Sequence, residues 1–95
     1  GMATWCANFH GEVSELWEAW RNGRIDQPCD KHERMVALEI ATDDEPLTCG
    51  AEELADIVIR VLDVAEQMGV DLQRAIELKM QYNASRSYRH GGKQA

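Results

Sequence analysis

Long apolar runs are absent from this 95-residue sequence. No window approaches the roughly 18 consecutive apolar residues of a membrane span, so we expect no membrane insertion. No charged and apolar leader precedes the first predicted helix, and Gly1 before Met2 is interpreted as an expression remnant. Strand-like alternation, internal repeats and low-complexity runs are also missing. These absences favour a soluble, cytoplasmic, all-α protein with a single domain over residues 2–88 and a flexible basic tail over residues 89–95.

Cysteine is scarce and widely spaced. The chain contains Cys6, Cys29 and Cys49, an odd number with no C-x-x-C pair. This spacing argues against a zinc site and against a disulfide framework. We therefore predict buried, reduced thiols.

Acidic residues are missing from the C-terminal end of the chain. The part before Lys79 has six basic against seventeen acidic residues, a balance of −11, whereas Lys79 and the residues after it carry +4. An acidic body argues against a nucleic-acid partner, which would require a basic stripe. The basic end could meet a small polyanion held near the body, or simply neutralise an acidic surface beside it. Composition leaves both alternatives open.

Apolar residues recur at helical spacing in three long segments and one short segment. We predict helices over residues 4–22, 31–40, 49–68 and 72–86. Gly23 and Gly69 follow two of these segments, where glycine is a common C-terminal stop. Thr48 and Asp71 precede two others, where their side chains are suited to cap the first turn.

The predicted apolar stripes exceed what so short a chain can cover by itself. Trp5, Trp17 and Trp20 lie on or near one helix, and we interpret them as core residues rather than as a stacking surface for a nucleobase. A twofold dimer is the commonest closed arrangement of subunits. We therefore predict a short helical bundle that dimerisation completes into a four-helix-bundle-like core. A homotetramer, formed as a dimer of dimers, is the larger alternative.

Two carboxylate pairs repeat the same pattern. Glu12 and Glu15 are one helical turn apart, as are Glu53 and Asp56, and each pair lies on the same flank of its apolar stripe. If the two helices pack antiparallel or at a shallow angle, the four acids can converge. Four converging carboxylates would need a compensating cation in order to remain ionised. Oxygen-only ligands select hard ions, so the expected metal is Mg²⁺, with Mn²⁺ as a substitute.

Acid pairs at this spacing arise often in so acidic a chain, and solvated surface is the alternative interpretation. We interpret Asp63 and Glu66 as such a surface pair. No His lies three residues after any of the four candidate acids, so the di-iron chemistry of Glu-x-x-His bundles is not expected. Arg60, one turn beyond Asp56, is expected to pair with Asp56 or Asp63.

The order of these motifs resembles the MazG-like all-α nucleoside triphosphate pyrophosphohydrolases. The family pattern is E-x-x-E on one helix, E-x-x-D on the next, and a Lys and an Asn on a third. "EVSE", "EELAD" and "KMQYNASR" match it in that order. The matching residues, with the Arg that follows them, are Glu12, Glu15, Glu53, Asp56, Lys79, Asn83 and Arg86. The resemblance extends from His10 to Gly92 and covers most of the chain.

The resemblance implies hydrolysis of a noncanonical or pyrimidine (deoxy)nucleoside triphosphate between its α- and β-phosphates, which gives a monophosphate and pyrophosphate. It implies that the four acids hold Mg²⁺ and that Glu12 or Glu15 also positions or deprotonates a water molecule. Lys79 and Arg86 would neutralise charge on the leaving pyrophosphate, and Asn83 would hydrogen-bond a phosphate or the sugar.

The chain departs from the family before its first motif. Only about ten residues precede Glu12, whereas family members usually carry another helix there that contributes aromatic residues to base recognition. Either the base pocket is built differently, or a partner subunit supplies it, or part of it is missing. A noncatalytic helical oligomerisation and interaction module that retains the family fold is therefore the alternative function.

Overall fold

A computed structural model describes residues 1–89, and every regular element in that range is a helix. The elements are α1 (Met2–Arg21), α2 (His32–Ala37), α3 (Cys49–Met68) and α4 (Leu72–Arg89). The all-α prediction is thus confirmed for these residues, and each predicted helix is present: α3 has the predicted bounds, and the other three differ at their ends by a few positions. The predicted flexible tail lies outside the described residues, apart from Arg89 at the end of α4.

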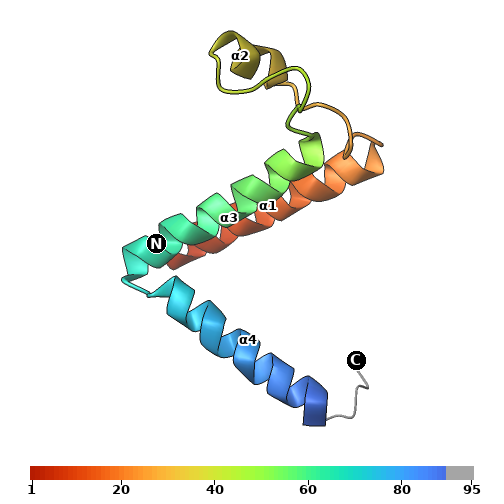
Figure 1. Ribbon diagram of the computed structural model, residues 1–95. Coiled ribbons are helices and arrows are strands. Elements are labelled where there is room, and N and C mark those ends of the chain that lie inside the picture. The colour runs from red at the N-terminus through yellow and green to blue at the C-terminus, as the bar shows by residue number, and fades with distance from the viewer. Residues whose placement is uncertain (90–95) are drawn as a thin grey trace. The chain divides into compact units, whose positions relative to one another are not determined.

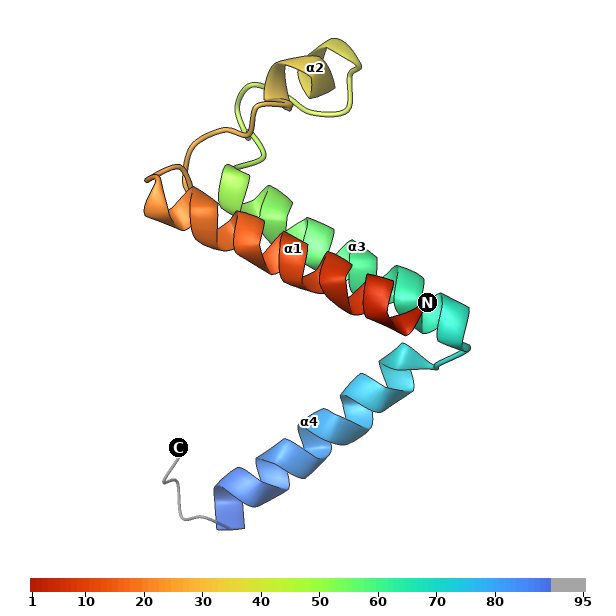
Figure 2. The same cartoon turned by 180° about the vertical axis from the view of Figure 1, so that it is seen from behind.

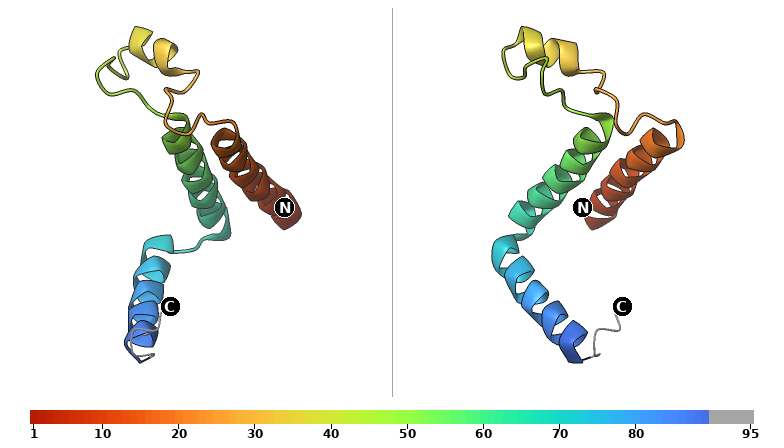
Figure 3. Two further views of the ribbon diagram at one scale, coloured as in Figure 1. Left: turned by 90° about the vertical axis from the view of Figure 1, so that its right-hand side faces the viewer. Right: turned by 45° about the vertical axis from the view of Figure 1, so that its right-hand side comes forward.

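The chain divides into two compact units, Gly1–Val64 and Ala65–Ala95. The first unit contains α1, α2 and most of α3, and the second contains the end of α3 together with α4. Within the first unit, α1 and α3 run side by side in opposite directions (Figures 1 and 2). The two views of Figure 3 show the same pairing, with α2 in the long connection that joins the two helices. This antiparallel pair is one of the arrangements that would bring the two carboxylate motifs together.

Local signals set the ends of α3 and α4. The Thr48 hydroxyl accepts a hydrogen bond from a backbone amide in the first turn of α3 (3.2 Å), and the Asp71 carboxylate does the same for α4 (3.1 Å). Both residues therefore act as the predicted N-caps. Gly69 follows α3 with a φ of +67°, as a helix-ending glycine is expected to do.

Two short segments pair with each other beside the beginning of α3. One is residues 24–29, after α1, and the other is residues 47–50, which lead into α3; we call them the clamp. The clamp is held by backbone hydrogen bonds between its two segments. The amide of Cys29 donates to Leu47 (2.8 Å), that of Cys49 to Gln27 (2.8 Å) and that of Gly50 to Ile25 (2.9 Å). These bonds satisfy backbone groups that the connection would otherwise leave unpaired, and they fix where the connection leaves α3.

Gly50, in the first turn of α3, lies directly against Ile25 of the other clamp segment. The residue is buried, and a Cβ atom added to it would lie 2.5 Å from Ile25 Cγ1 and 2.9 Å from the Ile25 carbonyl oxygen. Both separations are shorter than two such atoms tolerate, so the close approach requires glycine.

A residue with left-handed backbone geometry lies just after the short helix α2, which ends at Ala37. Glu39 has a φ of +60°, and the amide of Ile40 donates back to the Met35 carbonyl (2.9 Å). Glycine adopts this conformation without the steric cost that a side chain brings.

We expect Glu39→Gly to raise the free energy of unfolding by about 0.5 kcal/mol. Urea titration would measure this gain, and Glu33→Gly, inside α2, should instead lower stability by about 0.5–1 kcal/mol.

Large apolar side chains of the described chain remain exposed. Trp17 and Trp20 are 57% and 61% exposed, and their rings stack with centroids 5.7 Å apart and planes 8° from parallel. The prediction that they are core residues is therefore wrong for the single chain, while Trp5 is half-buried. A pair of packed helices in so short a chain leaves too little other chain to cover these side chains. Their burial in a dimer stays a prediction.

The cysteines are only partly buried. Cys29 is 4% exposed, Cys49 is half-buried, and Cys6 lies exposed on α1. The prediction of three buried thiols is thus correct for Cys29 alone. All three are free thiols, as the spacing predicted.

Candidate functional site

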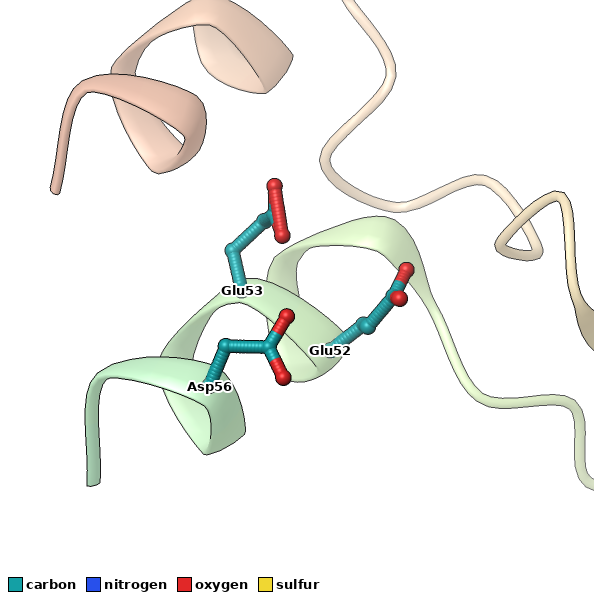
Figure 4. A group of neighbouring side chains, drawn as sticks. All are labelled: Glu52, Glu53 and Asp56. Carbon is teal, nitrogen blue, oxygen red and sulfur yellow. The ribbon is translucent and has the colours of Figure 1, made fainter. Parts of the chain in front are cut away.

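Three carboxylates gather at the beginning of α3. Glu52, Glu53 and Asp56 each offer one oxygen atom, and these oxygens all lie within 4.8 Å of one another (Figure 4). All three side chains are half-buried. They occupy the first two turns of α3, whose start is fixed by the Thr48 cap and the clamp.

One member of this cluster, Glu52, belongs to neither of the two predicted carboxylate pairs. The E-x-x-D pattern begins at Glu53 and passes over the glutamate directly before it. The signal was present, because Glu52 and Asp56 are four residues apart and therefore neighbours on one face of a helix. Glu53 and Asp56, by contrast, lie together as the spacing predicted.

Glu15 reaches the same place from α1. It lines a cavity of about 260 Å³ together with Glu52, Glu53 and Asp56. Partial burial raises the pKa of Glu53 above its usual value, and the negative charges of Glu15, Glu52, Asp56 and Glu12 raise it further. The carboxylates of both predicted pairs are thus close enough to Glu53 to disfavour its ionisation.

Glu12 has a partner of its own. Its carboxylate lies 3.5 Å from the Arg60 guanidinium, and its side chain is only 12% exposed. Within the described residues Arg60 therefore pairs with α1, and the expectation that it pairs with Asp56 or Asp63 is wrong. The antiparallel packing of α1 and α3 offers Arg60 a partly buried carboxylate, and solvent screens its attraction less than that of an exposed carboxylate on the same helix as Arg60. A metal-ligand role for Glu12 stays a prediction.

Basic side chains line the same cavity. Lys31 Nζ lies 2.6 Å from Glu52 Oε2 and 3.2 Å from Asp30 Oδ1, and Arg24 is also part of the lining. The hydrogen bonds to Glu52 and Asp30 raise the pKa of Lys31 above its usual range. No sequence pattern singled out Lys31, because its position depends on how the clamp folds the connection back onto α3.

The three predicted phosphate-binding residues belong to α4, in the second unit. Lys79 Nζ lies 5.1 Å from the centre of the Tyr82 ring, and the Arg86 guanidinium lies 5.5 Å from it. Asn83 is exposed and lies four residues after Lys79, so the two share a helix face. The convergence of these residues with the carboxylates stays a prediction.

The donor chemistry of the carboxylate cluster fits a hard divalent cation. The candidate ligands are carboxylate oxygens, which Mg²⁺ and Mn²⁺ prefer, and their separations allow one ion to contact several of them. Acidic groups at a protein surface also cluster without a metal. The partial burial of this cluster and the raised pKa of Glu53 indicate that its charges are imperfectly compensated by the chain itself.

A comparison with protein-family models, with curated proteins and with solved structures found no match. The resemblance to MazG-like enzymes therefore rests on the residues of this chain. Within residues 1–89, none of the helices combines the length and the apolar character needed to cross a bilayer.

Proposed function

We propose that this protein is a Mg²⁺-dependent nucleotide pyrophosphohydrolase that cleaves a (deoxy)nucleoside triphosphate into a monophosphate and pyrophosphate. One observation carries the proposal. Three of the four acids in the MazG-like motifs, Glu15, Glu53 and Asp56, line one cavity although they come from two different helices. Acidic residues scattered over a surface would not be expected to follow the order of the family motifs along the sequence and also to lie together in the structure.

The carboxylates have separable tasks in this proposal. Glu53 and Asp56, with Glu52 beside them, would hold the metal. A bound Mg²⁺ supplies charge neutralisation for phosphate oxygens and lowers the pKa of a coordinated water. Glu15 is then the better candidate to position the attacking water, because the Glu12 carboxylate is engaged by Arg60. Lys79, Asn83 and Arg86 would bind the leaving pyrophosphate or the nucleotide.

The direct test is incubation of the protein with a panel of canonical and noncanonical deoxynucleoside triphosphates in the presence of Mg²⁺. Chromatography should detect monophosphate and pyrophosphate in equal amounts for at least one substrate. Lack of turnover with every triphosphate, from protein that is folded and binds Mg²⁺, would refute the enzyme. Lack of both turnover and Mg²⁺ binding would favour the noncatalytic helical module.

We also propose that the protein is a homodimer or homotetramer. An apolar groove of about 490 Å³ runs along α1 and α3 in the first unit. Its lining includes the exposed residues Trp17, Trp20 and Leu54. Exposed apolar surface of this kind is typical of subunit interfaces. The free thiols suit a reducing compartment, so we place the protein in the cytoplasm.

Substitution of a residue that lines the groove should dissociate the oligomer. We expect Trp20→Glu to weaken self-association by about 100-fold or more, because it places a charge in an apolar contact. Light scattering at matched concentrations would measure the change in mass. Ile40→Glu is the control, since Ile40 is 71% exposed and does not line the groove. A monomeric wild type would contradict the assembly, and an unchanged mass in Trp20→Glu would contradict the groove as its interface.

A further inference from the structure

The cavity beside the carboxylates has a basic wall that the motif pattern does not include. Lys31 and Arg24 line it, and both residues come from the connection between α1 and α3. They belong to the same compact unit as Glu15, Glu53 and Asp56. The clamp fixes this connection against the first turn of α3 through three backbone hydrogen bonds.

Glu52 links the basic wall to the carboxylate cluster. Its carboxylate lies 2.6 Å from Lys31 Nζ, and one of its oxygens is also within 4.8 Å of oxygens of Glu53 and Asp56. A cation held by the cluster would therefore lie close to the Lys31 ammonium. The Glu52 carboxylate would then lie between two positive charges, and an anionic ligand in the cavity would offset the repulsion that remains between them.

Lys31 can accommodate such an anion. Its side chain is 59% exposed, although the ammonium contacts two carboxylates. An ammonium has three N–H donors, and Glu52 and Asp30 account for two of them. Arg24 adds a second cationic group to the same lining, with a planar set of donors suited to phosphate oxygens.

We propose that Lys31, assisted by Arg24, binds the phosphate chain of a triphosphate whose metal is held by the adjacent carboxylates. This inference rests on the proposed function and adds a phosphate-contacting residue to it. The cavity then has an acidic part for the metal and a basic part for the polyphosphate, both built from one compact unit. The competing explanation is that Lys31 serves only as a counter-ion that holds Glu52 in place.

The two explanations predict different behaviour for Lys31→Met. The probe is imidodiphosphate, a pyrophosphate analogue that resists hydrolysis, titrated calorimetrically in saturating Mg²⁺. A lost charge-assisted hydrogen bond should weaken its binding by about 10- to 100-fold. Binding of Mg²⁺ alone should change by less than about fivefold, because the Lys31 side chain is 59% exposed and solvent screens its charge. Lys31→Arg should recover most of the imidodiphosphate affinity, because it restores the positive charge.

Arg21→Met is the matched control. Arg21 is about as exposed as Lys31 and likewise pairs with a glutamate, Glu18, at 3.7 Å, but it does not line the cavity, so its loss should leave imidodiphosphate binding unchanged. Equal binding by wild type and Lys31→Met would overturn the inference. Parallel loss of Mg²⁺ and imidodiphosphate binding in Lys31→Met would also overturn it in favour of the counter-ion role.

The same titration separates this inference from the proposed function. Imidodiphosphate binding that depends on Mg²⁺ and on Lys31, in a protein that hydrolyses no triphosphate, would support the phosphate site and refute the enzyme. Hydrolysis that is insensitive to Lys31→Met, in KM as well as in kcat, would support the enzyme and refute the phosphate role of Lys31.

Discussion

Glu53→Gln is expected to lower kcat/KM by about 10³-fold while making the metal-free protein more stable. In the proposed enzyme, the loss of activity would follow from removing a charged metal ligand from the carboxylate cluster, since a catalytic metal lowers the activation barrier by several kcal/mol. The gain in stability follows from the raised pKa of Glu53, which reports that the folded protein disfavours this negative charge. An amide of the same size removes the charge and keeps the shape.

The stability difference has a defined dependence on pH. Because folding raises the pKa of Glu53, its ionised form destabilises the folded state at neutral pH, and this penalty shrinks as the pH falls through the raised value. Below the ordinary value of 4.5, Glu53 is protonated in both states and the penalty is gone. Denaturant unfolding with EDTA present should therefore show the largest advantage of Glu53→Gln near pH 7 and little advantage at acidic pH.

Two further measurements sharpen this prediction. Saturating Mg²⁺ should reverse the order of stability, because a ligand that binds the folded wild type raises its free energy of unfolding. Asp63→Asn is the matched control, since Asp63 is an exposed acid on α3 outside the cluster and should change neither activity nor the response to Mg²⁺. A Glu53→Gln protein that is less stable than wild type at pH 7 without metal would contradict the electrostatic account.

Gly50→Ala is expected to lower the free energy of unfolding by about 2–3 kcal/mol. The new methyl group would lie 2.5 Å from Ile25 Cγ1 and 2.9 Å from the Ile25 carbonyl oxygen, so the clamp must move away from α3. The better helix propensity of alanine offsets only about 0.5–1 kcal/mol of this cost. A loss of this size is a large fraction of the stability of a small domain.

Two further variants test the close packing at Gly50. Gly11→Ala is the matched control on α1, because a Cβ there meets nothing within 4 Å and should stabilise the protein by about 0.5–1 kcal/mol. Adding Ile25→Ala to Gly50→Ala removes the contact with the side chain but leaves the contact with the carbonyl oxygen. The clash with the carbonyl oxygen should persist in the double variant, so the Ile25→Ala substitution should not restore the free energy of unfolding to that of wild type. Urea titrations would measure all of these values, and a Gly50→Ala protein as stable as wild type would contradict the packing.

The features that could be predicted from the sequence depend on neighbours along the chain. Thr48 and Asp71 cap their helices through amides three residues later, and Gly69 ends α3 through its own backbone freedom. Glu53 and Asp56 lie together because helical spacing alone places them on one face. Such signals are local, so a short window of sequence contains them.

The remaining features depend on contacts between distant segments. The Arg60–Glu12 pair forms because α1 and α3 pack antiparallel, and no spacing within α3 reveals it. Lys31 reaches Glu52 because the clamp folds the connection back, and the exposure of Trp17 and Trp20 depends on how little chain covers them. Sequence periodicity indicates the helix face on which a side chain lies, but it does not identify the residue of another segment that this side chain contacts.

The most direct test of the central claim is ³¹P NMR of a reaction mixture that contains a hydrolysable triphosphate, Mg²⁺ and the protein. The account predicts that monophosphate and pyrophosphate resonances grow together, that EDTA stops them, and that Glu53→Gln suppresses them while Asp63→Asn does not. Growth of diphosphate and orthophosphate resonances, or triphosphate resonances that never change for any base, would contradict it.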